Sequence, residues 1–295
     1  MYRNHSAGRR KNGGRMLTTQ SGILSRAEFD WFRKLIEKNT GLHILDYKVT
    51  FLTNRLLKRM RVLGIDTFED YHNMLEQEGP QGEELKVLLE EIVVFESWFF
   101  RNTKQFTILS DVILPALVNE KIDNDKRVII NILGCSAGQE PYSIAILLHE
   151  MMPPHKRRLF RINAVDISMK LLRKAKNGFY KEYEINGLPD KLLWKHFERV
   201  EGGYQISEEI SRMVNFFQFN LKDSNWNKFR FSDAIFCRNT LIYFREESRK
   251  QIMDRLIDSI RPGGFILLGH SEILNEDDYR NISSIAHNIY RKVKA

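Results

Sequence analysis

Cysteine is scarce in this chain of 295 residues, because only Cys135 and Cys237 occur. Two thiols cannot form the disulfide framework typical of small secreted proteins. Long apolar runs are also missing, since none approaches the ~18 residues that a membrane-spanning helix needs. No charged segment followed by an apolar stretch opens the chain, so we expect no secretory signal. These absences favour a cytoplasmic protein with ordinary buried thiols and no direct membrane insertion.

Negative charge is absent from the first 22 residues. That segment carries five basic residues and no acid, which is five of the net +8 charges of the whole chain. Its Gly, Arg and Asn content predicts a disordered basic tail over residues 1–22. An anion-binding arm for nucleic acid or lipid is the alternative, but no pattern of interleaved aromatic residues supports it. We therefore expect no nucleic-acid partner.

Residues 23–94 show helical periodicity and predict an all-α N-terminal domain. Ser25, followed three residues later by Glu28, has the spacing of a capping box. Helices are expected over about 25–40, 46–63, 67–77 and 82–93, and glycine follows each of the first three. The helix over 46–63 is unusually basic: Lys48, Arg55 and Arg59 lie beside its apolar stripe, with Lys58 further round.

Residues 95–295 alternate short β-branched runs with helical segments. Strands are expected over 128–133, 159–165, 214–219, 234–237, 265–268 and 289–293, the last at a sheet edge. Helices are expected over 106–118, 141–151, from 168, and over 246–260, the last ended by Pro262-Gly263-Gly264. This alternation predicts an α/β, doubly wound domain with a parallel sheet covered on both faces. Residues 197–213 break the alternation around Gly202-Gly203, which predicts a small antiparallel β-subdomain.

Polar residues follow several of the expected strands. Gly134 opens a glycine-containing turn before a helix, where backbone N–H groups can approach a ligand. Asp166 ends the next strand and can accept hydrogen bonds from ribose hydroxyls, although it could instead cap the following helix. The pairs Asn220-Leu221 and Arg238-Asn239 follow two further strands. Ligands of open parallel sheets bind at these strand ends, so the set favours a nucleoside ligand.

A hydrolase is the competing interpretation of the glycine turn. Residues 134–138 match G-x-S-x-G with Ser136 as nucleophile, and Asp233 and His270 follow in the order of a triad. The turn follows the first expected strand of the domain, however, and no oxyanion-hole segment precedes it. We therefore disfavour this interpretation and expect structural roles for His270 and His287.

The segments 99–101, 134–143, 164–168, 236–244 and 262–272 together resemble the CheR family of chemotaxis-receptor glutamate methyltransferases, over residues 25–293. The runs FCRN-x-x-IYF and GHSE are the most specific. The resemblance implies an all-α domain followed by a Rossmann-like methyltransferase domain with a small β-subdomain. It also implies S-adenosyl-L-methionine as cofactor, no metal, and transfer of a methyl group to glutamate carboxylates of a receptor.

The resemblance also implies roles for individual residues. Cofactor contacts carry over to Ser97, Arg101, Gly134, Glu140, Asp166, Asn220, Leu221, Arg238 and Asn239. Arg101 and Tyr243 match positions that shape the methyl-transfer site. Lys48, Arg55, Lys58 and Arg59 match the face that meets the acidic helical bundle of the receptor. Because a carboxylate acceptor is already ionised near neutral pH, the reaction needs no general base.

Two positions depart from the family pattern and keep alternatives open. Phe95 stands where the family usually has an amide, and Gln139 stands where it usually has an acid. These differences leave room for a methyltransferase-fold protein that acts on another substrate, or for a non-catalytic module that senses the cofactor and signals.

Overall fold

The computed structural model describes residues 22–92, 97–121 and 126–293, and within them no helix is long and apolar enough to cross a membrane. The chain divides into two compact units. The helical unit contains the chain up to Phe32 together with Leu45–Leu88, and the sheet unit contains Arg33–Ile44 and everything from Leu89 onward. Residues 1–21 of the expected tail lie outside the described residues. The domain boundary expected at residues 94 and 95 stays a prediction.

The expected helices of the N-terminal region are confirmed. They are α1 (Arg26–Thr40), the 3-10 turn η1 (Asp46–Lys48), α2 (Val49–Leu63), α3 (Phe68–Glu78) and α4 (Glu83–Ile92). The capping box forms, because the Ser25 N–H donates to Glu28 Oε2 at 2.7 Å and the Glu28 N–H donates to Ser25 Oγ at 3.3 Å. Gly64 ends α2 in a left-handed conformation at φ +70°.

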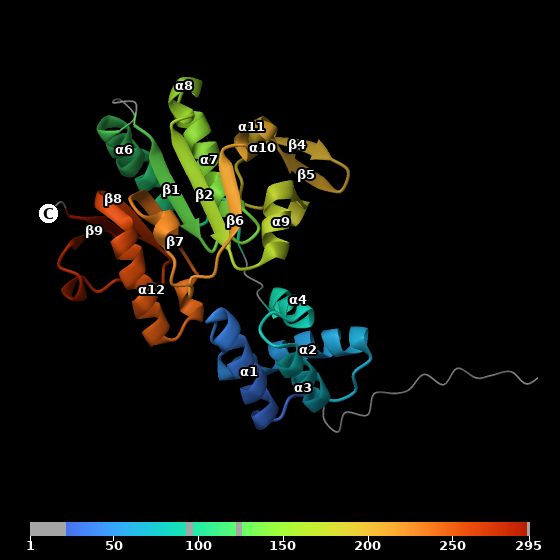
Figure 1. Cartoon of the computed structure of the whole chain (residues 1–295). Helices are drawn as coiled ribbons and strands as arrows, with labels where there is room; N and C mark the ends of the chain where they lie inside the picture. Colours follow the sequence, from blue (N-terminus) through green and yellow to red (C-terminus); the bar gives the residue numbers. More distant parts are fainter. Residues whose placement is uncertain (1–21, 93–96, 122–125, 294–295) are drawn as a thin grey trace, which may run out of the picture. The chain divides into compact units, whose positions relative to one another are not determined.

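A seven-stranded sheet organises the sheet unit (Figure 1). Its strands are β1 (Val128–Leu133), β2 (Phe160–Asp166), β6 (Val214–Gln218), β7 (Ser232–Cys237), β8 (Ile260–Leu268), β9 (Ile282–Ala286) and β10 (Ile289–Lys292). They lie in the order β6-β2-β1-β7-β8-β10-β9, and the first five are parallel. The chain moves outward from β1 in one direction and then from β7 in the other. Such a switch point, at the carboxyl ends of the strands, is where doubly wound sheets bind ligands.

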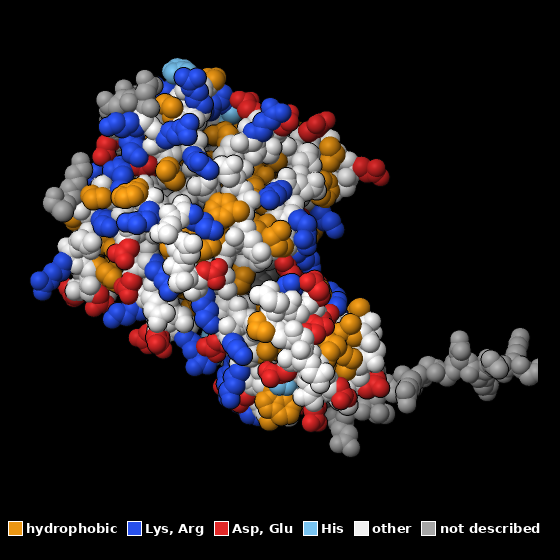
Figure 2. Space-filling view, viewed as in Figure 1, with side chains coloured by type: hydrophobic (Ala, Val, Ile, Leu, Met, Phe, Trp, Pro, Cys, Tyr) orange, Lys and Arg blue, Asp and Glu red, His pale blue; other side chains and the backbone are white. Residues whose placement is uncertain are grey.

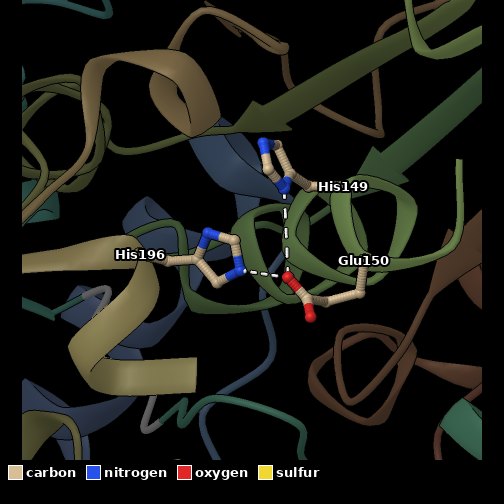
Figure 3. A group of neighbouring side chains, drawn as sticks. All are labelled: His149, Glu150 and His196. Carbon is tan, nitrogen blue, oxygen red and sulfur yellow. Dashed lines mark hydrogen bonds and ion pairs between the residues drawn. The ribbon is translucent and has the colours of Figure 1, made fainter. Parts of the chain in front are cut away.

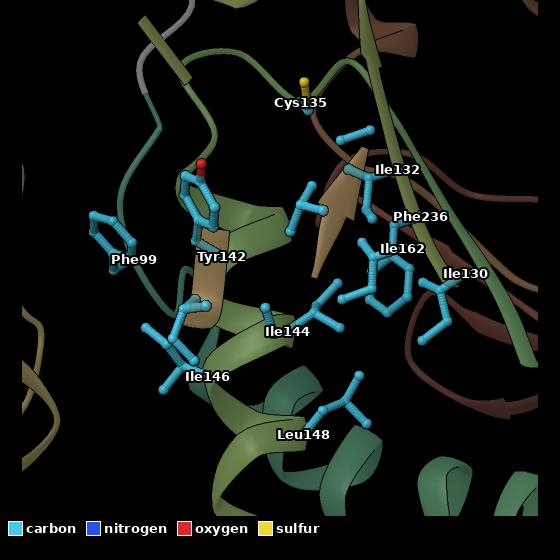
Figure 4. Packing of buried hydrophobic residues seen from close by; sticks show 14 of the residues in the cluster. Phe99, Ile130, Ile132, Cys135, Tyr142, Ile144, Ile146, Leu148, Ile162 and Phe236 are labelled. Carbon is cyan, nitrogen blue, oxygen red and sulfur yellow. The ribbon is translucent and has the colours of Figure 1, made fainter. Parts of the chain in front are cut away.

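Helices cover both faces of this sheet, as predicted. The parallel strands are joined by α7 (Gln139–Met151), α9 (Met169–Asn177) and α12 (Glu246–Ser259). Alternate residues of one strand enter different cores: Ile132 packs in the cluster with α7, and Leu133 packs in the cluster with α12. Figure 4 shows Tyr142, Ile144 and other apolar side chains of the first cluster.

The expected β-subdomain is also confirmed. The strands β4 (Phe197–Val200) and β5 (Gly203–Ile206) form an antiparallel hairpin through Gly202, and β3 (Phe179–Tyr180), which the sequence does not reveal, pairs with β5. Short helices flank it: η4 (Glu182–Glu184), α10 (Asp190–His196) and α11 (Glu208–Ser211). The remaining short elements are α8 (Pro154–Arg157), η5 (Asn227–Phe229), η6 (Leu241–Tyr243) and η7 (Glu276–Asp278).

Three details of the prediction are wrong. The last strand, β10, lies between β8 and β9 and is not the sheet edge. Strand β8 begins at Ile260, so Pro262-Gly263-Gly264 lies within a strand whose pairing register shifts there, which accommodates the missing proline N–H. The helix expected over 106–118 is α5 (Thr103–Ile108), a π turn (Leu109–Ile113) and α6 (Leu114–Glu120), with the wider turn just before Pro115.

Candidate active site

Glycine at position 134 permits a close approach between two loops at the carboxyl ends of β1 and β7. Gly134 has φ +84°, and a Cβ atom there would collide with the Thr240 side chain. The Thr240 hydroxyl in turn donates to the Leu133 carbonyl at 3.3 Å. A side chain at position 134 would therefore both strain the backbone and separate the two loops.

Two cavities meet at this contact, and we call them together the cleft. The first is lined by Ser97, Arg101, Gly134, Ser136, Glu140, Arg238, Asn239 and Thr240. The second is lined by Thr40, Leu42, Gly134, Asp166, Ile167, Phe219, Asn220, Leu221, Thr240 and Phe244. Gly134 and Thr240 belong to both. All nine residues predicted to contact a cofactor line one cavity or the other.

The first cavity holds a buried ion pair. Glu140 lies in the first turn of α7, and its Oε1 accepts from Arg238 Nη1. Their side chains are only 10% and 4% exposed, so the pair is desolvated and each charge depends on the other. Arg238 Nη2 also donates to the Arg101 carbonyl at 2.5 Å, while Arg238 Nε has no partner among the described residues.

Arg101 brings a second cation to the first cavity. Its guanidinium lies 4.2 Å from the centre of the Trp98 ring, a cation–π contact. Burial, and after it the neighbouring charge of Arg238, lowers the pKa of Arg101, but an arginine remains protonated at neutral pH. The same end of the cleft therefore contains two arginines and one carboxylate, which suits a ligand that carries a carboxylate of its own.

Asp166 is the charged group of the second cavity. Its carboxylate is 2% exposed and accepts from the backbone N–H of Ser136 at 2.8 Å and of Ser168 at 3.0 Å. Burial raises the pKa of Asp166 to about 6, and the two N–H groups limit that rise. Ser168, not Asp166, caps α9, because its hydroxyl accepts from the Leu171 N–H. Asp166 therefore keeps acceptor positions for a ligand's hydroxyl groups.

The second cavity also includes residues that the sequence prediction missed. Thr40 and Leu42 come from the end of α1 and the segment after it, and Leu42 forms an antiparallel bridge with Phe244. The Asn220 amide donates to the Asn39 carbonyl at 3.3 Å, which fixes Asn220 beside the same segment. No local pattern marks these contacts, because they join residues about 180–200 positions apart in the sequence.

Glu272, from the GHSE run, holds the loop at residues 239–242 in place. Its carboxylate accepts from the backbone N–H groups of Asn239, Thr240, Leu241, Ile242 and Gly269 at 2.7–3.2 Å. The residue is 3% exposed, so these bonds replace its hydration. The sequence prediction gave this residue no role, although the acid lies within a motif that it singled out.

Backbone strain concentrates around the cleft. The described non-glycine residues with left-handed φ are Phe100, Asn102, Ser136, Phe231, Asn239 and Asn288. The first two flank Arg101, and Ser136 and Asn239 line the first cavity. Such conformations cost of order 1–3 kcal/mol each and persist where the surrounding structure enforces them, often at functional sites.

Three residues singled out in the sequence, Tyr243, Gln139 and Phe95, are not among the described lining residues of the two cavities. Tyr243 does not line either cavity, and its carbonyl accepts from the His43 N–H at 2.7 Å. Gln139 is buried, and its Oε1 has no hydrogen-bond partner among the described residues. Phe95 lies outside the described residues.

The structure rules out the hydrolase alternative. Asp233 lies at the amino end of β7, where it binds Lys121 and Arg261 and accepts from the Ile129 N–H. Ser136 follows the carboxyl end of β1, about seven residues further along, which is roughly 20 Å in an extended strand. A serine and an aspartate at opposite ends of two neighbouring strands cannot both contact one histidine.

The two thiols are buried, as expected. Cys135 follows β1 and Cys237 ends the neighbouring strand β7. Burial raises the pKa of each thiol well above its ordinary value. Both groups are therefore neutral and unreactive near pH 7.

The predicted receptor-binding residues lie on the helical unit, and one of them has an internal partner. Arg59 binds Glu84 through two hydrogen bonds of 2.8 and 2.6 Å, and Tyr71 donates to the same carboxylate at 2.7 Å. Lys58 is exposed, Lys48 and Arg55 are half-buried, and the Arg55 guanidinium lies 5.2 Å from the Phe51 ring centre. The charge of Arg59 is therefore already paired within the helical unit, and its side chain is 15% exposed.

Comparisons with known proteins match nearly the whole chain. Residues 96–289 match the family model described as CheR methyltransferase, SAM binding domain, and residues 27–93 match the one described as CheR methyltransferase, all-alpha domain. A chemotaxis protein methyltransferase of Borreliella burgdorferi is 34% identical over 91% of this chain and 95% of that protein. Chemotaxis protein methyltransferase 2 of Vibrio cholerae is 33% identical over 90% of each chain. The corresponding protein of Escherichia coli is 31% identical over 86% of this chain and 87% of its own.

Proposed function

Because the chain belongs to the CheR methyltransferase family, we propose that it methylates glutamate side-chain carboxylates of chemotaxis receptors and so forms glutamyl methyl esters. That it is an S-adenosylmethionine-dependent methyltransferase follows from the family itself. The observation that best supports the finer statement is the composition of the cleft. Its described lining residues include two arginines near an ion-paired carboxylate, and no histidine, lysine or cysteine is among them.

The cleft suits S-adenosylmethionine in the chemistry of its groups. Asp166 can accept from both ribose hydroxyls, and Asn220 and Leu221 border the space where an adenine would lie. Arg238 and Asn239 can meet the carboxylate of the methionine part, and Glu140 its ammonium. When bound, the cofactor supplies a methyl group on a positively charged sulfonium sulfur. That sulfur is a good leaving group because it departs as a neutral thioether.

The protein would then mainly orient the two reactants. A glutamate carboxylate is ionised near pH 7, so its oxygen can form the new C–O bond as the S–CH₃ bond breaks, with no proton transferred. Arg101 and Tyr243 would position that carboxylate. Orientation alone can supply up to about 7–11 kcal/mol of a reaction barrier in well-ordered sites.

A transfer assay with methyl-labelled S-adenosylmethionine and receptor cytoplasmic fragments tests the proposal. We expect label on the receptor that mild alkali releases as methanol, since esters hydrolyse under conditions that spare methylated amines. A receptor with glutamine at the acceptor positions is the matched control. Alkali-stable label would indicate another acceptor, and binding of the cofactor without transfer would favour a sensing module.

The basic face of α2 supplies a separate test of the receptor partner. Lys48, Arg55 and Lys58 would meet acidic receptor helices, so Lys58→Ala should raise the KM for receptor a few-fold, as expected for one exposed charge pair. Its kcat and cofactor affinity should not change. Lys104→Ala, an exposed change on α5, is the control. An unchanged KM in Lys58→Ala would remove α2 from the proposed interface.

A further inference from the structure

A groove rich in arginine lies at the edge of the sheet opposite the cleft. It is an open groove with a volume of about 440 Å³ beside α8 and the amino ends of β1, β2 and β6. Five of its lining residues are arginines: Arg127, Arg157, Arg158, Arg161 and Arg212. They come from three separate stretches of chain, so their convergence is a product of the fold. Figure 2 shows basic side chains gathered around α8.

Among the described residues that line the groove, Glu209 carries the one carboxylate, and it is already engaged. Glu209 Oε1 lies 3.0 Å from Arg157 Nη2 and 2.9 Å from His149 Nε2. The contact with His149, together with Arg157, lowers the pKa of Glu209, so it is ionised at neutral pH. Arg212 binds Glu208, which leaves Arg127, Arg158 and Arg161 without a carboxylate partner among the described residues.

A neighbouring cluster holds another carboxylate, Glu150, which is already paired. His149, Glu150 and His196 lie beside the groove with their ligand atoms within 4.8 Å of one another (Figure 3). Glu150 Oε1 is bound by Lys195 at 2.8 Å and by His196 at 2.7 Å. The lysine ammonium already supplies the cation that this carboxylate needs, so the cluster acts as an internal ion pair.

Two arginines of the groove, Arg158 and Arg161, differ from the paired arginines of the sheet unit. Arg238 and Arg261 each bind carboxylates directly, whereas the exposed Arg158 makes no ion pair or hydrogen bond with any described residue through its side chain. Arg161 donates only to the neutral Asn163 amide at 3.3 Å. Several cations held in one concave surface repel each other, and an anionic ligand would relieve that repulsion.

We propose that this groove binds a soluble phosphorylated compound with a planar or apolar body, of the nucleoside polyphosphate class. Guanidinium groups bind phosphate through paired N–H donors, which lysines do not match. Leu159, Phe160 and Met213 line the same groove and can contact the body of such a ligand. A concave site encloses a discrete molecule, whereas the flat surface of a bilayer would touch only its rim.

Calorimetric titration of the full chain, with S-adenosylhomocysteine saturating the cleft, tests this proposal. The probes are inorganic tripolyphosphate and guanosine triphosphate at low ionic strength. We expect Arg158→Gln/Arg161→Gln to weaken binding of both by about a hundredfold, since each of the two lost charge-assisted hydrogen bonds is worth about tenfold. The control Arg173→Gln/Arg249→Gln has the same change of net charge at exposed positions on α9 and α12.

The outcomes separate the alternatives. Equal weakening in both variants would reduce the effect to net charge and overturn the site. Absence of binding to either probe would overturn it as well. Flotation with vesicles of phosphatidylglycerol and phosphatidylcholine supplies the lipid arm, and groove-dependent binding to vesicles alone would exclude a soluble ligand. Tighter binding of guanosine triphosphate than of tripolyphosphate supports the contact with the apolar residues, and equal affinities would contradict it.

Discussion

Charged side chains are arranged differently at the two ends of the parallel strands. At the carboxyl edge the charges are buried and matched: Glu140 binds Arg238, and Glu272 and Asp166 accept backbone N–H groups. At the amino ends of β1 and β2 three exposed arginines of the groove, Arg127, Arg158 and Arg161, have no carboxylate partner among the described residues. The geometry at the carboxyl ends is therefore fixed, and removal of any one of these charged residues would disturb it. The groove has three cations that a ligand could pair with, and loss of one of them should cost little in folding.

Removal of Glu272 should test this contrast most severely. Glu272→Ala leaves five backbone N–H groups without their acceptor, and we expect a loss of at least about 3 kcal/mol of unfolding free energy. Cofactor affinity should fall too, because the loop at 239–242 lines the cleft. Glu272→Gln should recover part of both. Denaturant unfolding and calorimetry with S-adenosylhomocysteine measure the effects, with the exposed Glu247→Ala as control.

Replacement of Arg101 should separate chemistry from binding at the same edge. We expect Arg101→Ala to lower turnover by about 10²-fold, the order seen when a reactant is misplaced by about 1 Å. Cofactor affinity should fall much less, because Arg238 and Asn239 remain. Single-turnover assays and calorimetry distinguish the two quantities. Turnover equal to that of the parent chain would exclude the positioning role.

The buried carboxylate of Asp166 should make cofactor binding depend on pH. Its pKa is raised to about 6, and a ligand that donates hydroxyl groups binds the ionised form. The affinity for S-adenosylhomocysteine should therefore be constant above pH 7 and fall as pH drops through 6, by up to about tenfold per unit below it. Asp166→Asn should bind more weakly and lose this step. A step of the same size in the variant would assign it to another group.

Replacement of an arginine by glutamine in the groove should have the smallest effect on stability. Arg158→Gln removes an exposed cation from a crowded group, so we expect the unfolding free energy to stay within about 0.5 kcal/mol of the parent value. Arg238→Gln, by comparison, leaves Glu140 buried without its partner and should cost about 3–5 kcal/mol. Denaturant unfolding of both variants would measure the difference between the edges. Similar losses would mean that the amino edge is also built on internal pairs.

Features set by nearby residues were predictable from the sequence. The Ser25–Glu28 capping box, the glycine after α2 and the hairpin at Gly202 depend on contacts a few positions apart. The strand-end residues were found because parallel strands bring their carboxyl ends to one edge, and family resemblance supplied their proposed roles. All nine predicted cofactor residues line the cleft for these reasons.

Features set by distant contacts were not predictable. Nothing local shows that Thr40 and Leu42 reach the cleft, or that Glu272 accepts from a loop about 30 residues earlier in the chain. Pro262 suggested a helix end followed by a turn, but a register shift against β7 keeps it within a strand. The position of Arg59 on its helix predicted an exposed cation. In the structure it instead binds Glu84 of another helix. The order of β9 and β10 likewise depends on pairing that periodicity does not encode.

The burial of both cysteines has a practical consequence for spectroscopy. Neutral, enclosed thiols do not react with maleimide reagents in the native protein, and Cys135 and Cys237 are both of this kind. A cysteine introduced at an exposed position such as Trp194 would then be the selectively labelled site. Fluorophores or spin labels attached to one such residue in each compact unit would report the distance between the units without prior replacement of the native cysteines.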